Sequence, residues 1–423
     1  MKKLNKKQLE KNKKFLIREN DKAKFVAKMK YLMDAYGGEG TSKIIPPHIL
    51  ENAYSYRISP FKVTNINQPE CEPKGIKQLQ SAFSFLFKRT EVDLPNNNKM
   101  SLDDFLIVGI SFMRVMIWII SIKEEEEWAL EISNRLGEFS DMEIFMMIMS
   151  KVNKIADKIA FEISDYDKEL MWFVVKIEPI EGKMTVDFTI DLDGKAQEMR
   201  YFKTDEGSRP AYCVSMVKCQ MGMLEATIKP SLMGVKNKNA DIPVKVYYQN
   251  HAKLRLKERI DCLAMKDILI MLYTSLLKPV VIPTGKNRAL IEYRLLSSKV
   301  GYLVAEYIDG AVLIHTFLFI TSNGTPEGKK LYELTGLGKL DKKYLALDKL
   351  SSFIKSDIAN NEKLNSILVN SQCECLLQIE DSVQRLATKQ ADNSNIERIL
   401  NYLKKDTETI EIDDESTMHC IPG

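Results

Sequence analysis

Three side chains that could handle phosphate recur at intervals of four residues in the stretch NHAKLRLKERID, which begins at Asn250. They are His251, Arg255 and Arg259, and Glu258 stands beside them. A spacing of four places side chains on one face of a helix, and Asn is a residue type that caps helix starts. We therefore expect a helix from His251 with a cationic ridge, in which Glu258 pairs with either arginine. The neighbouring face of the helix carries an apolar stripe that would pack against a sheet: Ala252, Leu256, Ile260 and Leu263.

The chemistry that suits such a ridge is RNA cleavage without a metal. That reaction needs a base for the 2′-hydroxyl, an acid for the departing 5′-oxygen and cations for the charge that builds at phosphorus. Arginine matches phosphate oxygens, and histidine exchanges a proton near neutral pH. His315 is the second candidate proton carrier, in the apolar segment AVLIHTFLFIT. Strand alternation would place it on the face of Leu313, Phe317 and Phe319.

A structural role is the alternative for the same residues. A single histidine in an apolar strand is often an interior side chain, and Arg and Glu on a helix often form a solvated, paired face. The spacing does not decide between the two interpretations. A packed sheet that brought His251 and His315 to a common cleft would favour chemistry.

No cofactor or metal is expected. The seven cysteines are scattered and lack C-x-x-C pairs, so they match neither a zinc site nor a disulfide framework. Two segments hold Gly and Lys close together, TGLGKL from Thr335 and PTGKNR from Pro283. Neither has the spacing of a phosphate-binding P-loop. A reducing compartment is the natural inference for so many unpaired thiols.

The composition indicates a globular chain with charged ends. Its 423 residues are 45% hydrophobic and 28% charged, with a net charge of +3, so no global field indicates nucleic acid. Residues 1–30 hold twelve Lys or Arg against three acids, and residues 406–415 hold six acids and no base. The first residues, MKKLNKKQLEKNKKF, lack the apolar core of a secretory signal. We expect a cytoplasmic protein, or a virion protein if a phage encodes it.

One segment is apolar enough to raise the question of a membrane span. Phe105–Ile122 is eighteen residues long and almost wholly apolar, with Arg114 at its middle. A central charge costs about 2.5–3.5 kcal/mol on insertion, and the length is marginal for a bilayer. We therefore expect a helix buried in a helical domain, with Arg114 paired or reaching the surface, and no membrane partner.

The hydrophobic period predicts a multi-domain α+β chain. Apolar residues recur at helical spacing in the first part of the chain, and the spacing changes to two near Leu170. Helical spacing returns after the strands near His315. In the third part a helix over Met265–Leu277 precedes several strands, with a tight turn at Asp309 and Gly310. The predicted parts are a helical domain with a basic arm (1–165), an antiparallel β-rich segment (166–240), a module of two helices and then an antiparallel sheet (241–325), a helical region (326–405) and an acidic disordered tail (406–423).

The stretch HAKLRLKER resembles the H-A-x-x-R-x-x-E-R motif of small bacterial domains related to RelE-like ribonuclease toxins, in which helices precede an antiparallel sheet. The resemblance covers about residues 244–321. It implies metal-free RNA cleavage through a 2′,3′-cyclic phosphate, with His251, Arg255 and Arg259 in the site and Glu258 as an orienting partner. His315 lies in a strand where such folds often place another catalytic side chain.

The long N-terminal part departs from that family, whose members are usually about a hundred residues long. A domain that keeps the fold without the activity is therefore the alternative. The stretch PVKVYYQNHAKLRLKER is also similar in style to proteins of Bacteroides-type bacteria and their phages. We expect RNA or another nucleic acid as the partner, bound or cleaved by the 241–325 module. The other hypothesis is a structural or packaged component of a phage or mobile element that uses the module as a scaffold. Homo-oligomerisation stays open.

Overall fold

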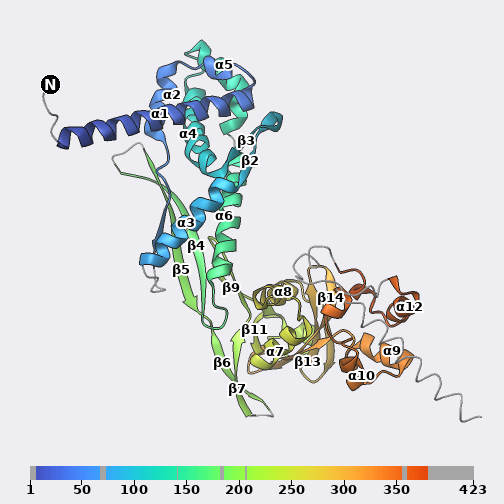
Figure 1. Ribbon diagram of the computed structural model, residues 1–423. Coiled ribbons are helices and arrows are strands. Elements are labelled where there is room, and N and C mark those ends of the chain that lie inside the picture. The colour runs from blue at the N-terminus through green and yellow to red at the C-terminus, as the bar shows by residue number, and fades with distance from the viewer. Residues whose placement is uncertain are drawn as a thin grey trace, which may run out of the picture. The chain divides into compact units, whose positions relative to one another are not determined.

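The computed structural model describes residues 6–66, 73–140, 142–181, 185–204, 207–354 and 360–379. It confirms an α+β chain with a helical N-terminal region and a sheet-rich middle. The chain forms two compact units (Figure 1). Unit 1 comprises residues 1–165, 169–196 and 217–223, and unit 2 comprises 166–168, 197–216 and 224–423. Residues 380–423, which include the predicted acidic tail, lie outside the described residues.

Unit 1 is a helical body with a small sheet. Amphipathic helices form wherever apolar residues recur at a period of 3.6. The helices are α1 (Lys6–Gly37), α2 (Pro47–Ala53), α3 (Pro73–Arg89), α4 (Leu102–Ser121), α5 (Glu127–Leu136) and α6 (Met142–Ile163), with short 3₁₀ turns at Thr41–Lys43, Tyr54–Tyr56, Pro95–Asn97 and Gly137–Ser140.

The apolar segment is α4, a core helix of unit 1. It is long and apolar enough to cross a membrane, but 56% of its most apolar window is buried inside the protein. The Ser101 hydroxyl caps its start, accepting from the Asp104 N–H at 3.1 Å. Arg114 donates from Nη1 to the Tyr56 carbonyl at 2.8 Å. The predicted buried helix with a satisfied Arg114 is confirmed.

The sheet of unit 1 has the strand order β1-β5-β4. β4 (Glu169–Pro179) and β5 (Val186–Ala196) are antiparallel, and β1 (Lys62–Asn65) pairs with β5 in parallel. α6 packs along β4 (Figure 1), and α3 packs against β1. β2 (Glu91–Asp93) pairs with β3 (Lys99–Ser101). β8 (Ser215–Lys218) and β9 (Gly222–Glu225) pair with each other in a two-stranded ribbon.

Unit 2 contains an eight-stranded sheet. Seven strands follow the order β12-β13-β14-β15-β11-β7-β6, and β10 pairs with β11. The predicted hairpin turn is confirmed, since Asp309 and Gly310 have φ of 50° and 75°. The bounds are β6 (Met199–Thr204), β7 (Gly207–Cys213), β10 (Thr227–Ile228), β11 (Val244–Gln249), β12 (Val281–Gly285), β13 (Arg288–Leu295), β14 (Ser298–Ile308) and β15 (Ala311–Phe319).

The strands that follow the two helices, β12 to β15, pair antiparallel as predicted, but β11 joins them and makes the sheet of unit 2 mixed. β11 pairs with β15 in parallel, whereas all other strand pairs of this sheet are antiparallel. The long connection between β11 and β15 allows a parallel return, which a short hairpin loop does not. The sheet also continues from the 241–325 module into β7 and β6. A buried cluster joins the two parts: Phe202, Ala211, Cys213, Tyr247, Ala311 and Leu313.

Helices cover this sheet and follow it in the chain. α7 (Asn250–Arg259) packs on β15, and α8 packs on β13. α8 spans Met265–Leu277, which are the predicted bounds. The next helix begins at Pro326, where the predicted helical region begins, and the Thr325 hydroxyl caps it by accepting from the Gly328 N–H at 2.9 Å. The later helices are α9 (Pro326–Thr335), α10 (Lys339–Tyr344), α11 (Ser351–Ile354) and α12 (Glu362–Asn370), followed by a 3₁₀ turn at Glu374–Leu376.

Candidate functional site

α7 presents the predicted ridge. The apolar stripe is buried as expected, at Ala252, Leu256, Ile260 and Leu263, and it holds the helix against the sheet. His251 is exposed in the first turn of the helix. The predicted cap is displaced by one residue, because Asn250 is already helical and Gln249 occupies the N-cap position without a side-chain hydrogen bond.

Both arginines of the ridge have carboxylate partners. Arg255 Nη1 lies 2.6 Å from Glu258 Oε2, and Arg259 Nη2 lies 3.5 Å from Glu258 Oε1. The predicted pairing of Glu258 is therefore confirmed for both. Burial acts to raise the pKa of Glu258, but the hydrogen bond from Arg255 and the two guanidinium charges outweigh it, so the pKa lies below its ordinary value. Arg259 is also bonded to Asp348.

The two arginines differ in their freedom to meet a ligand. The Arg259 side chain is only 14% exposed, and burial lowers the pKa of its guanidinium. Such an enclosed pair holds α7 to the segment that carries Asp348, and removing one partner would leave a buried charge. The Arg255 side chain is 41% exposed. A surface pair of this kind contributes little to stability and leaves donors for another anion.

A cleft of about 380 Å³ opens beside the ridge. We call it the arginine cleft. Its wall carries four cations and one carboxylate, so it favours an anion. The charged residues that line it are Arg255, Arg259, Lys339, Lys342 and Asp348, and His251 also lines it.

A second cleft, of about 640 Å³, lies over the strands of the sheet. We call it the histidine cleft, because both His251 and His315 line it. His251 and Thr316 line the two clefts together, so the clefts adjoin at these residues. Arg255 and Arg259 do not line the histidine cleft. Three other cations and one carboxylate do: Lys203, Arg209, Arg288 and Glu306.

A β-bulge sets the direction of His315. Consecutive residues of β14, Val304 and Ala305, pair with Thr316 and Ile314, so His315 is an extra residue on β15. Cross-strand partners share a face of a sheet, and an extra residue shifts the alternation by one. The predicted grouping of His315 with the two phenylalanines that follow it is therefore wrong. The bulge leaves His315 and Thr316 together at the histidine cleft.

A carboxylate holds the imidazole of His315. Nε2 lies 3.0 Å from Glu306 Oε2, and the two side chains are 25% and 21% exposed. The other oxygen, Glu306 Oε1, lies 3.3 Å from Arg288 Nε. Glu306 therefore orients the ring, while Arg288 fixes the carboxylate. With Nε2–H donating to Glu306, Nδ1 is the nitrogen that can accept a proton.

A buried lysine fastens the loop that forms one wall of the arginine cleft. Lys342 is 2% exposed, and its ammonium donates to the carbonyls of Thr321 at 2.8 Å and Gly328 at 2.9 Å and to Asn323 Oδ1 at 2.5 Å. Burial lowers the pKa of Lys342 to about 8. Its three donors are occupied, so Lys342 positions the loop instead of offering a hydrogen bond to a ligand.

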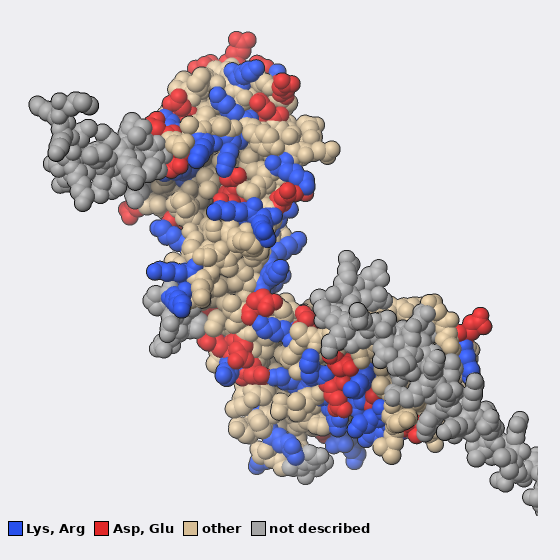
Figure 2. Space-filling view, in the orientation of Figure 1, with Lys and Arg blue, Asp and Glu red and all other residues tan. Residues whose placement is uncertain are grey.

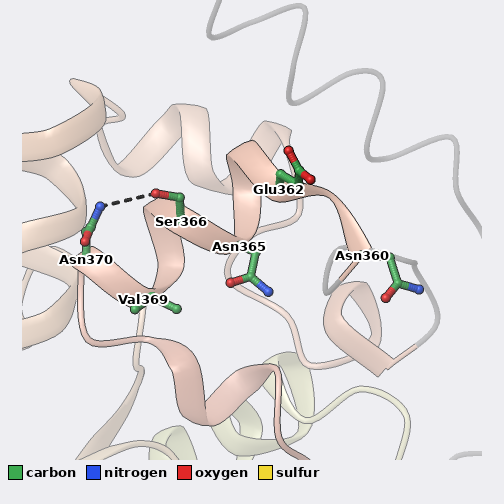
Figure 3. Close-up of a pocket in the computed structure, with 6 residues that line it drawn as sticks. All are labelled: Asn360, Glu362, Asn365, Ser366, Val369 and Asn370. Carbon is green, nitrogen blue, oxygen red and sulfur yellow. Dashed lines mark hydrogen bonds between the residues drawn. The ribbon is translucent and has the colours of Figure 1, made fainter.

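A third hollow lies along α12, and Figure 3 shows its side chains. Three of the six are amides, and Asn370 Nδ2 donates a hydrogen bond of 3.4 Å to Ser366 Oγ. Glu362 is the charged residue of the set. This hollow brings together no histidine and no cation, so it offers no comparable chemistry.

The surface charge around these features is mixed. Figure 2 shows Lys and Arg interspersed with Asp and Glu over the face in view. Selectivity for an anion therefore depends on the local composition of the clefts. Among the described residues, no three His, Cys, Asp or Glu side chains gather closely enough to hold a metal ion.

Comparisons of the chain with protein-family models, curated proteins and solved structures give no match. The geometry of the two clefts is therefore the basis for inferring a function of unit 2. Several of their residues had no signal in the sequence, because no motif surrounds them and only the fold brings them to the site: Lys203, Arg209, Arg288, Glu306, Lys342 and Asp348.

Proposed function

We propose that unit 2 binds RNA and cleaves it without a metal in the histidine cleft. The observation that carries the proposal is a pair of imidazoles in one cleft, with His315 held 3.0 Å from Glu306. Two proton carriers are what an internal attack of the 2′-hydroxyl on phosphorus requires. RNA is the partner in this proposal, and the cytoplasm is the compartment that supplies it.

Each histidine has a role in the proposed reaction. His315 Nδ1 takes the proton of the 2′-hydroxyl as its oxygen forms a bond to phosphorus. The bond from phosphorus to the 5′-oxygen breaks, and His251, starting as imidazolium, gives its proton to that oxygen. The products are a 2′,3′-cyclic phosphate and a 5′-hydroxyl. Glu306 stabilises the positive charge that His315 gains.

Cations around the cleft stabilise the charge that grows on the non-bridging oxygens. Lys203, Arg209 and Arg288 line the histidine cleft. A guanidinium is charged at every working pH and matches two phosphate oxygens at once. In this proposal Arg255 binds a neighbouring phosphate, while Arg259 and Glu258 position α7.

Incubation of the full chain with single-stranded RNA in EDTA tests the proposal. Wild type should yield fragments ending in a 2′,3′-cyclic phosphate, and a DNA strand of the same sequence should stay intact. His251→Ala and His315→Ala should each lower the rate by roughly 10²- to 10⁴-fold, the usual worth of one proton-transfer group.

The matched control is His48→Ala, because His48 is an exposed histidine on α2 in unit 1. It should cleave like wild type. Equal rates in wild type and both cleft variants would mean that the activity belongs to a contaminant, and the catalytic proposal would fail.

Binding without cleavage is the second candidate function, in which unit 2 serves a larger nucleic-acid assembly as a scaffold. The engagement of Arg255 and Arg259 with carboxylates favours it. It predicts RNA affinity that falls with salt, through the phosphate contacts, and no cyclic-phosphate product.

A further inference from the structure

Asp348 lines the arginine cleft, and one oxygen of its carboxylate lacks a hydrogen bond from any described residue. Asp348 is 9% exposed and bonds Arg259 through Oδ2, while Oδ1 is buried with no donor among the described residues. A buried carboxylate oxygen without a donor is costly, and most such groups in native proteins have a partner. Since an ionised carboxylate only accepts, a ligand that satisfies Oδ1 must bring an O–H or N–H group.

The same cleft offers donors for an anion. Arg255 is bonded to Glu258 through Nη1. Its other N–H groups have no partner within the described part of the chain and can donate to a ligand. Lys339 is exposed on the cleft wall. A phosphodiester alone suits these cations but has no proton for Asp348, which would repel it. The combination therefore matches a phosphate with a hydroxyl close to it, as in a ribonucleotide.

The position of the cleft fits a strand that continues from the proposed reaction. His251 and Thr316 line both clefts, so a chain of nucleotides can pass from one to the other. We propose that the arginine cleft is a ribonucleotide subsite, in which Arg255 and Lys339 bind a phosphate and Asp348 Oδ1 accepts a hydrogen bond from a ribose 2′-hydroxyl. This inference rests on the proposed function and makes Asp348 a residue that selects RNA over DNA.

Binding of modified strands tests the subsite. The His315→Ala protein, which should not cleave, is titrated with a labelled RNA strand and with the same strand carrying 2′-fluoro groups, which cannot donate. A hydrogen bond to a charged group is typically worth enough to make the hydroxyl strand bind about tenfold or more tightly. A single 2′-fluoro group moved along the strand should reproduce that loss at one position only.

Two further substitutions in the His315→Ala protein separate selectivity from packing. In Asp348→Asn the amide oxygen should stay with Arg259, so an N–H group replaces Oδ1, and the preference for the hydroxyl strand should fall to within about threefold. Lys339→Gln removes a phosphate contact and should weaken both strands alike, keeping their ratio. Thermal unfolding midpoints check that each protein is folded.

The outcomes distinguish this inference from the proposed function. Equal binding of hydroxyl and fluoro strands, or a preference that survives Asp348→Asn, overturns the subsite even if wild type cleaves RNA. A position-specific preference in a protein that never cleaves RNA supports the subsite and removes the catalytic proposal. Absence of binding to either strand overturns both.

Discussion

The pairing of His315 with Glu306 is the contact on which the proposed chemistry depends. The two residues sit on adjacent strands, and the bulge at His315 brings Nε2 to 3.0 Å from Glu306 Oε2. A carboxylate in this position fixes one tautomer of the ring and stabilises its protonated form. The arrangement separates the task of holding the proton carrier from the task of moving the proton.

We expect Glu306→Gln to lower the cleavage rate by roughly tenfold or more, because the neutral amide no longer stabilises the imidazolium of His315. Single-turnover cleavage at saturating enzyme measures the chemical step. Glu333→Gln is the control, since Glu333 forms an exposed pair with Lys329 at 4.0 Å. A Glu306→Gln rate equal to that of wild type would show that the contact has no part in catalysis.

The sequence predicted part of this site and could not predict the rest. The ridge follows from spacing alone, because residues four apart share a helical face. The contact of His315 with Glu306 depends on a strand register with one extra residue. The residue types near His315 do not predict a β-bulge. Asp348 meets Arg259 across 89 positions of sequence, so only the packed fold could show that Arg259 is engaged.

At the scale of elements, one loop shapes the arginine cleft, and Lys342 on α10 holds it. The ammonium donates to three oxygens of residues 321–328. Because Ser322, Asn323 and Gly324 line the cleft, the lysine sets the position of that wall. Sequence patterns identified α8 and the tight turn at Asp309 and Gly310, since the helical period and the turn residues are strong signals. They gave no sign of this loop, whose structure depends on a helix further along the chain.

Lys342→Met should destabilise the protein by roughly 2–4 kcal/mol near neutral pH, because buried carbonyls lose their donor. The pKa of Lys342 is lowered by burial from 10.5 to about 8, so between these values the unfolded chain binds more protons than the folded one. The pH-dependent part of this group's contribution to stability is therefore full above about 10.5 and is lost as the pH falls through about 8, and the hydrogen-bonding part remains at neutral pH.

Urea unfolding of both proteins from pH 7.5 to 10 measures this difference. The excess stability of wild type over Lys342→Met should grow as the pH rises, by up to about 1.4 kcal/mol per pH unit. A gap that stays constant across this range would show that Lys342 titrates alike in the folded and unfolded chain.

At the scale of the whole molecule, the chain divides differently from its sequence pattern. The change of period near Leu170 marked a β-rich segment, but its strands contribute to both units: β4 and β5 to unit 1, β6 and β7 to unit 2. Local periodicity predicts that a segment is a strand, but it does not predict which other strand it pairs with. Pairing of β11 with β7 gives the 241–325 module a neighbour outside itself, which a motif match over residues 244–321 cannot show.

The two units carry separate reporters of unfolding. The tryptophans Trp118, Trp128 and Trp172 belong to unit 1, and Cys373 belongs to unit 2. Burial raises the pKa of the Cys373 thiol to about 12, so this thiol should react with a labelling reagent only when unit 2 opens. Tryptophan fluorescence and Cys373 labelling in urea therefore follow units 1 and 2 independently.

An RNA strand that binds the clefts should stabilise unit 2 alone, because a ligand stabilises the folded body that binds it. At a concentration of 100 times Kd the gain is about 2.7 kcal/mol. We expect the urea midpoint of Cys373 labelling, read by mass spectrometry, to rise with RNA while the tryptophan midpoint stays fixed. A rise in the tryptophan midpoint alone would place RNA binding in unit 1, and equal shifts of both would mean that the units unfold as one body.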